Sequence, residues 1–179
     1  ACEEAKARNI TISCDLNFRK KLWSKEKAGQ VMGKLCDYID YCIANEEDAK
    51  DVFGIEADNT DIYSGKLNHD GYVSVAKKLT ERFNFKGVAI TLRESLSAND
   101  NNWSGMLYTD GNAYFSKEYG IDIVDRVGGG DSFGGGLIYS LISKYDCQKA
   151  IEFYKSIKDK ETRNKWKNGL KARSGGRVI

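Results

Sequence analysis

Short apolar runs alternate with longer amphipathic segments along the 179 residues of this chain. Runs rich in β-branched and aromatic residues predict strands at Ile10–Asp15, Tyr41–Ala44, Lys86–Leu92, Gly105–Thr109, Asn112–Ser116 and Ile121–Val124. Apolar residues at helical spacing predict helices at Ala1–Arg8, Ser24 to about Tyr38, Asn45–Phe53, Gly71–Phe83, Asp131–Tyr145 and Gln148–Leu170. Ser24 can cap the helix that it opens, and Gly54 ends the acidic helix Asn45–Phe53.

This alternation predicts an α/β protein with a mostly parallel sheet flanked by helices. The dipeptide Asp110-Gly111 is a strong hairpin signal, so we expect a local antiparallel addition at that point. A turn is expected at Asn99–Asn102. The length suits one domain over residues 1–179, and there is no internal repeat.

Polar side chains follow several of the predicted strands. They form four clusters: Asp15 with Asn17 and Arg19; Asn45 with Glu46 and Glu47; Arg93; and the stretch Asp125 to Asp131. In open parallel sheets, ligands bind at the carboxyl ends of the strands. Each cluster alone is explained by an ordinary polar loop, but their shared placement predicts a site at one edge of the sheet.

The stretch Ile123–Ile142 carries the clearest chemistry. A strand-like run ends in Asp125, turns through Gly128, Gly129 and Gly130, presents Asp131 and continues as an apolar helix. Glycines leave backbone N–H groups open to an anion, and a helix N-terminus adds positive charge there. Asp131 is therefore a candidate base beside a phosphate. The alternative is a tight strand-to-helix turn with Asp131 as a cap.

Other phosphate-binding motifs fail on this sequence. A nucleotide P-loop requires Lys after its last glycine, and none follows at the right spacing. The dinucleotide fingerprint requires a glycine where Phe133 stands. The one histidine, His69, has no nucleophile elbow around it, and the five cysteines show no metal-binding spacing.

Charge and hydropathy exclude further classes. The net charge of +2 gives no overall attraction to nucleic acid or a membrane, and no apolar run has the length of a membrane span. Residues 155–179 carry six Lys and three Arg against two acidic residues, 9 − 2 = +7. We interpret that run as a solvated helix surface; nucleic-acid binding is the disfavoured alternative. We expect a soluble, cytoplasmic protein with reduced cysteines.

The glycine turn and the polar clusters after the other predicted strands resemble motifs of the ribokinase-like (PfkB) sugar kinases, and most of all of the 2-keto-3-deoxygluconate kinases. Asp125-Arg126-Val127-Gly128-Gly129-Gly130-Asp131-Ser132-Phe133 is similar to the C-terminal signature of that family, with Gly129 in place of Ala. The run Cys14 to Arg19 and the pair Leu22-Trp23 resemble its D-x-N-x-R…L-W segment. Asn45 to Asp48 resembles its N-x-x-E motif, with Asp48 in place of Glu, and Arg93 stands where T-L-G members have glycine.

The resemblance implies a ribokinase-like three-layer α/β/α fold, incomplete here, and roles for matching residues. Asp131 corresponds to the base, and the N–H groups of Gly128, Gly129 and Gly130 to an anion hole. Asp15, Asn17, Arg19 and Asp125 correspond to substrate- or phosphate-binding positions, and Thr91 with Arg93 to nucleotide contacts. Asn45, Glu47 and Asp48 correspond to the Mg²⁺ motif. ATP and Mg²⁺ are the implied cofactors, with a monovalent cation near Asp125 as a further candidate.

The resemblance runs from Ala1 to about Phe153 and covers the C-terminal nucleotide-binding and catalytic half of such a kinase. The N-terminal half, which carries most sugar contacts, has no counterpart, and residues 154–173 form an atypical basic segment, expected to be helical. Two functions follow: ATP-dependent phosphorylation of a sugar acid such as 2-keto-3-deoxygluconate, or an inactive nucleotide-binding or subunit-association module. In either case we expect a homo-oligomer or pairing with a missing half, because half of such a sheet leaves an edge uncovered.

Overall fold

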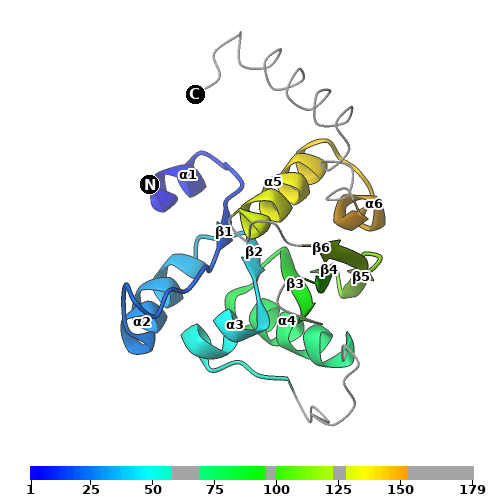
Figure 1. The fold of residues 1–179 in the computed structure, drawn as a ribbon. Coiled ribbons are helices and arrows are strands. Elements are labelled where there is room, and N and C mark those ends of the chain that lie inside the picture. Colours follow the sequence, from blue (N-terminus) through cyan, green and yellow to red (C-terminus); the bar gives the residue numbers. More distant parts are fainter. Residues whose placement is uncertain (58–68, 96–99, 123–127, 153–179) are drawn as a thin grey trace. The chain divides into compact units, whose positions relative to one another are not determined.

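The computed structural model describes residues 1–57, 69–95, 100–122 and 128–152. They belong to two compact units, Ala1–Arg126 and Val127–Ile179, and Figure 1 labels the helices and strands of each. The prediction of a single domain over residues 1–179 stays a prediction. Asp125 and the basic segment 154–173 lie outside the described residues.

A six-stranded sheet forms the centre of the first unit. Its strands are β1 (Ser13–Asp15), β2 (Tyr41–Ala44), β3 (Gly87–Ser95), β4 (Asp100–Thr109), β5 (Asn112–Phe115) and β6 (Tyr119–Asp122). They run in the order β1-β2-β3-β4-β5, and β6 pairs with β4. β1, β2 and β3 are parallel, so their carboxyl ends meet at one edge, whereas β4 pairs antiparallel with β3, β5 and β6.

Four helices belong to this unit: α1 (Cys2–Ala7), α2 (Lys25–Cys36), α3 (Glu46–Phe53) and α4 (His69–Phe83). Their ends follow the sequence signals. Ser24 Oγ accepts a hydrogen bond from Lys27 N–H at 3.2 Å and caps α2. Asn45 caps α3, and Gly54 ends it with φ 66°, a left-handed conformation that glycine adopts without strain.

One hydrophobic core joins α2, α3 and α4 to the parallel strands. Its fully buried side chains include Cys36 of α2, Ala49 of α3, Leu79 of α4, and Val88 and Ile90 of β3. The apolar faces of the helices thereby remove one face of the sheet from water, and this burial is the main stabilising contribution in the unit.

The buried carboxylate of Asp40 ties the amino-terminal ends of the parallel strands together. It accepts hydrogen bonds from Lys6 Nζ at 3.0 Å and from Ile12 N–H at 2.9 Å, and Lys86 Nζ lies 3.0 Å away. Burial alone raises the pKa of this carboxyl, but the Ile12 N–H and the two ammonium groups outweigh burial and lower it to about 2. Asp40 is therefore charged throughout the neutral range.

The second unit contains α5 (Gly129–Ile142) and α6 (Cys147–Glu152), which pack against each other. Asp146 caps α6 by accepting a hydrogen bond from Lys149 N–H at 2.9 Å. Ser140 is buried within α5 and donates its hydroxyl to the carbonyl of Gly136 at 2.9 Å. The helix predicted for Gln148–Leu170 is thus described only in its first turn and a half.

The α/β class with a sheet flanked by helices is confirmed, but several local predictions differ. β6 begins at Tyr119 rather than Ile121, and α5 covers Gly129–Ile142 rather than Asp131–Tyr145. The turn predicted at Asn99–Asn102 is wrong for its described part, because residues 100–102 open β4 and pair with β3 and β6. Cross-strand pairing overrides the polar, turn-like composition of these residues. The first strand is also shorter than predicted, since only Ser13–Asp15 pairs with β2.

Candidate functional site

Buried and exposed side chains alternate where the chain leaves β1. Leu16 and Phe18 are buried in the core, whereas Asp15, Asn17 and Arg19 are exposed. Leu16 N–H still donates to the Ile43 carbonyl at 2.9 Å, so the chain keeps its extended course one residue beyond the strand. Three exposed polar side chains therefore follow the carboxyl end of β1, as the sequence predicts.

A local turn fixes this exposed set, which we call the β1 strip (Asp15, Asn17 and Arg19). Asp15 Oδ1 accepts a hydrogen bond from Asn17 N–H at 3.1 Å, the geometry of an Asx turn. Asn17 has φ 39°, in the left-handed region that Asn tolerates better than most residues. The strip is thus held by its own side chains as well as by the two buried anchors.

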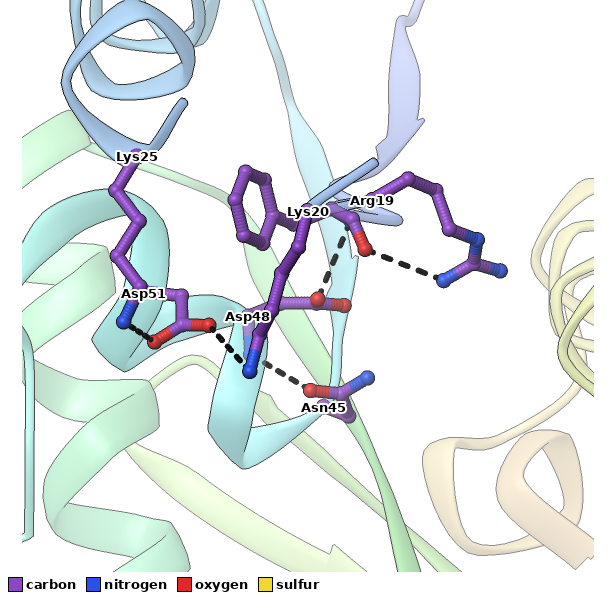
Figure 2. Close-up of polar contacts among 7 residues, drawn as sticks. Arg19, Lys20, Lys25, Asn45, Asp48 and Asp51 are labelled. Atoms are coloured by element: carbon purple, nitrogen blue, oxygen red, sulfur yellow. Dashed lines mark hydrogen bonds and ion pairs between the residues drawn. The ribbon is translucent and has the colours of Figure 1, made fainter. Parts of the chain in front are cut away.

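The amino terminus of α3 lies beside the β1 strip, and its buried carboxylate, that of Asp48, bonds the backbone of Phe18 between Asn17 and Arg19 (Figure 2). Asn45 Oδ1 accepts from Asp48 N–H at 2.7 Å, and Asp48 Oδ1 accepts from Phe18 N–H at 3.2 Å. Burial raises the pKa of Asp48 to about 6, with help from the nearby charge of Asp15 and against the hydrogen bonds from the backbone of Phe18 and Asn45. Sequence reasoning placed Asp48 in a metal motif and missed this anchoring contact.

The donor set at this point suits Mg²⁺ held mainly through water. Glu47 is exposed, whereas the oxygens of Asn45 and Asp48 already accept backbone hydrogen bonds. Among the described residues, no three His, Cys, Asp or Glu side chains gather into a preformed metal cage. Mg²⁺ commonly keeps several waters and uses one or two carboxylates together with substrate phosphates, so the residues fit that mode of binding.

The carboxyl end of β3 carries the two predicted nucleotide contacts. Thr91 is half-buried and Arg93 is exposed, and both belong to the same face of the strand. Arg93 lies opposite Trp103 of β4, which in turn lies opposite Tyr119 of β6. Directly opposed residues share a face, so the three form one row across the sheet. Sequence reasoning missed the two aromatics because it began these strands too late, at Gly105 for β4 and at Ile121 for β6.

The glycine turn belongs to the second unit and forms the amino terminus of α5. Gly128 is the N-cap with φ 80°, and no side chain caps the helix. A Cβ built on Gly129 or Gly130 would meet nothing within 4 Å, so packing in the described structure does not require glycine there. Asp131 is exposed in the first turn. Sequence reasoning placed Asp125 at the start of this motif, and that residue is outside the described ranges.

Comparison with known proteins settles the family. The model of the pfkB family carbohydrate kinases matches residues 1–153. The chain belongs to this family. The fold agrees: a 2-dehydro-3-deoxygluconokinase from Thermotoga maritima superposes with a TM-score of 0.80 at 46% identity, over 87% of this chain and 45% of its own. The predicted resemblance to PfkB kinases is thereby confirmed.

Two further relatives are similar to this chain. A PfkB family carbohydrate kinase from Listeria grayi has a TM-score of 0.73 at 32% identity and covers 87% of this chain and 45% of its own. A 2-dehydro-3-deoxygalactonokinase from Haloferax volcanii is 25% identical over 151 residues, which are 84% of this chain and 41% of that protein. The chain thus spans less than half the length of each of these three relatives. Among its described helices, none has the length and apolarity needed to cross a bilayer.

Proposed function

We propose that this chain supplies the nucleotide-binding and catalytic part of a cytoplasmic kinase that transfers a phosphoryl group from ATP to a hydroxyl of a sugar acid such as 2-keto-3-deoxygluconate. The observation that carries the proposal is the β1 strip, an arginine, an amide and a carboxylate exposed at the carboxyl end of a parallel strand in a PfkB protein. Relatives named for 2-dehydro-3-deoxy sugar acids support the choice of substrate class.

The β1 strip has the chemistry to bind such an acceptor. The planar guanidinium of Arg19 matches a carboxylate and donates hydrogen bonds in a fixed fork. Asn17 offers a donor and an acceptor for hydroxyl groups, and the carboxylate of Asp15 accepts from them. Charge-assisted hydrogen bonds of this kind contribute about 1.5–3 kcal/mol each, so Arg19 is the main determinant of acid recognition in this proposal.

The phosphoryl-transfer residues in the proposal come from the glycine turn and β3. The N–H groups of Gly128, Gly129 and Gly130, with the dipole of α5, stabilise charge on the transferring phosphoryl group. Asp131 takes the proton from the attacking hydroxyl. Thr91 and Arg93 contact the nucleotide phosphates, and Asp125 helps to hold the turn or a monovalent cation.

The Mg²⁺ motif of the first unit is a further part of the proposal. Glu47 and those oxygen lone pairs of Asn45 and Asp48 that accept no backbone hydrogen bond would hold the ion, mainly through water. When bound, the ion neutralises charge on the triphosphate. Asn45 and Asp48 act from their positions at the start of α3, where the hydrogen bonds described above already fix them.

A phosphoryl-transfer assay with ATP, Mg²⁺ and 2-keto-3-deoxygluconate tests this function. We expect the Asp131→Asn variant to lose on the order of 10² to 10⁴ in rate, because the amide keeps the size of the side chain but cannot accept the proton. The thermal unfolding midpoint of the variant serves as the folding control. Equal rates for the two proteins contradict the role of Asp131.

The coverage of the relatives supports a second candidate function, because the chain spans less than half the length of the Thermotoga and Haloferax kinases. In that case the chain is an inactive nucleotide-binding or association module, whose partner is either a second copy or a polypeptide equivalent to the rest of those relatives. Titration calorimetry with ATP and Mg²⁺ discriminates between the functions. Binding without turnover favours the module, and turnover favours the kinase.

A further inference from the structure

We propose that Asp51 is a positioning residue that, together with Asp48, fixes the loop carrying Arg19 against α3 and so orients the guanidinium for the acceptor carboxylate. The proposal rests on the function proposed above and deepens it. The two carboxylates lie three residues apart on α3, and residues at this spacing share one face of a helix. Both of them contact the segment between β1 and α2.

Asp51 joins Lys20 of that segment and Lys25, at the start of α2, to α3. Its side chain is only 10% exposed and pairs with Lys25, the first residue of α2, and with Lys20 Nζ at 3.7 Å. Hydrogen bonding to Lys25 is the largest cause that lowers the pKa of Asp51, and the charges of Lys25 and Lys20 add to it. One carboxylate therefore holds both the residue after Arg19 and the start of the next helix.

Hydrogen bonds fix the backbone before and after Arg19. The N–H of Phe18 donates to Asp48, and the carbonyl of Arg19 accepts from Leu22 N–H at 2.9 Å and from Trp23 N–H at 3.4 Å. Lys20 is drawn to Asp51. Figure 2 shows the consequence: Lys20 points toward α3, whereas the Arg19 side chain extends away from the two carboxylates.

This arrangement lowers the cost of ligand binding. An arginine on an unanchored loop loses backbone and side-chain freedom when it engages a carboxylate. Here the backbone on both sides of Arg19 is already fixed, and Arg19 Nη1 donates to the Phe18 carbonyl at 3.3 Å. Loss of the Asp51 anchor should therefore weaken acceptor binding, with little effect on nucleotide binding or on the chemical step.

The Asp51→Asn variant tests the proposal, with Glu56→Gln as a matched control. The control breaks the exposed ion pair between Glu56, which follows the carboxyl end of α3, and Lys50, whose Nζ lies 3.2 Å away. Amide hydrogen exchange at Phe18 and Leu22, whose N–H groups donate to Asp48 and to the Arg19 carbonyl, reports whether the loop is fixed. We expect exchange there to be about three to ten times faster in Asp51→Asn and unchanged in Glu56→Gln. Unchanged exchange in Asp51→Asn overturns the proposal.

Kinetics then separate positioning from a general structural role. We expect Asp51→Asn to raise KM for 2-keto-3-deoxygluconate about three- to tenfold with kcat and the KM for ATP within about twofold, and Asp51→Glu to recover most of the loss. Loss of kcat at unchanged KM overturns the positioning role. If the wild-type chain neither binds nor phosphorylates the sugar acid, the proposed function fails, and hydrogen exchange still decides whether Asp51 fixes the loop.

Discussion

Replacement of Asp40 by Asn tests how the parallel strands are held together. The variant keeps the shape of the side chain and an acceptor for Ile12 N–H, but it removes the charge that faces Lys6 and Lys86. The pKa of Asp40 falls from its ordinary value of 3.8 to about 2. At 1.36 kcal/mol per pKa unit, this difference corresponds to about 2 kcal/mol of stability at neutral pH.

The pH dependence distinguishes charge from packing. Because the folded pKa lies below the unfolded one, the stabilisation is present above about pH 4 and is lost as the pH falls toward 2. Urea unfolding at pH 7 should therefore show Asp40→Asn less stable than the wild type by about 2 kcal/mol, and at pH 3 by about half of that.

An exposed ion pair provides the control for this experiment. Glu81 and Lys77 lie 3.8 Å apart on α4 with both side chains exposed, so Glu81→Gln should change stability by less than about 0.5 kcal/mol. Equal stabilities of Asp40→Asn and wild type at pH 7, or a difference at pH 3 as large as at pH 7, would refute the reasoning.

Three further substitutions have expected outcomes. Since burial raises the pKa of Asp48 from 3.8 to about 6, the charged form is costly. Asp48→Asn should therefore stabilise the protein by about 3 kcal/mol at pH 8 and by almost nothing at about pH 3, which urea unfolding at the two pH values measures. Gly128→Ala should destabilise the protein by about 1 kcal/mol in thermal or urea unfolding, because the N-cap of α5 has φ 80°. Gly130→Ala should leave stability nearly unchanged, since its Cβ meets nothing within 4 Å, yet reduce phosphoryl transfer if the turn holds a phosphate; a parallel loss of stability would show that the glycine is structural.

Local signals in the sequence predicted the ends of several helices. Ser24 caps α2 and Gly54 ends α3, because each of these roles depends on a few neighbouring residues. The exposure of the β1 strip also follows from sequence, since alternation after a strand is a local pattern. The glycine turn at Gly128 opens a helix as predicted.

Long-range pairing explains what the sequence did not predict. The contact between Asp48 and Phe18 N–H spans thirty positions and depends on how α3 packs beside β1. The ion pairs of Asp51 with Lys20 and Lys25 depend on the same packing. The row of Arg93, Trp103 and Tyr119 follows only from the register of β3, β4 and β6. That register could not be predicted, because the polar residues at the start of β4 are typical of a turn.

Acceptor discrimination tests the central claim most directly, namely that the β1 strip selects a sugar acid for phosphorylation. Initial rates with ATP and Mg²⁺ are compared for 2-keto-3-deoxygluconate and for its neutral counterpart, in which a hydroxymethyl group replaces the carboxylate. We expect the wild type to favour the acid on the order of tenfold to hundredfold in kcat/KM, and Arg19→Gln to lose that preference. Equal kcat/KM values of the wild type for the two acceptors, or an unchanged preference for the acid in Arg19→Gln, would contradict the account.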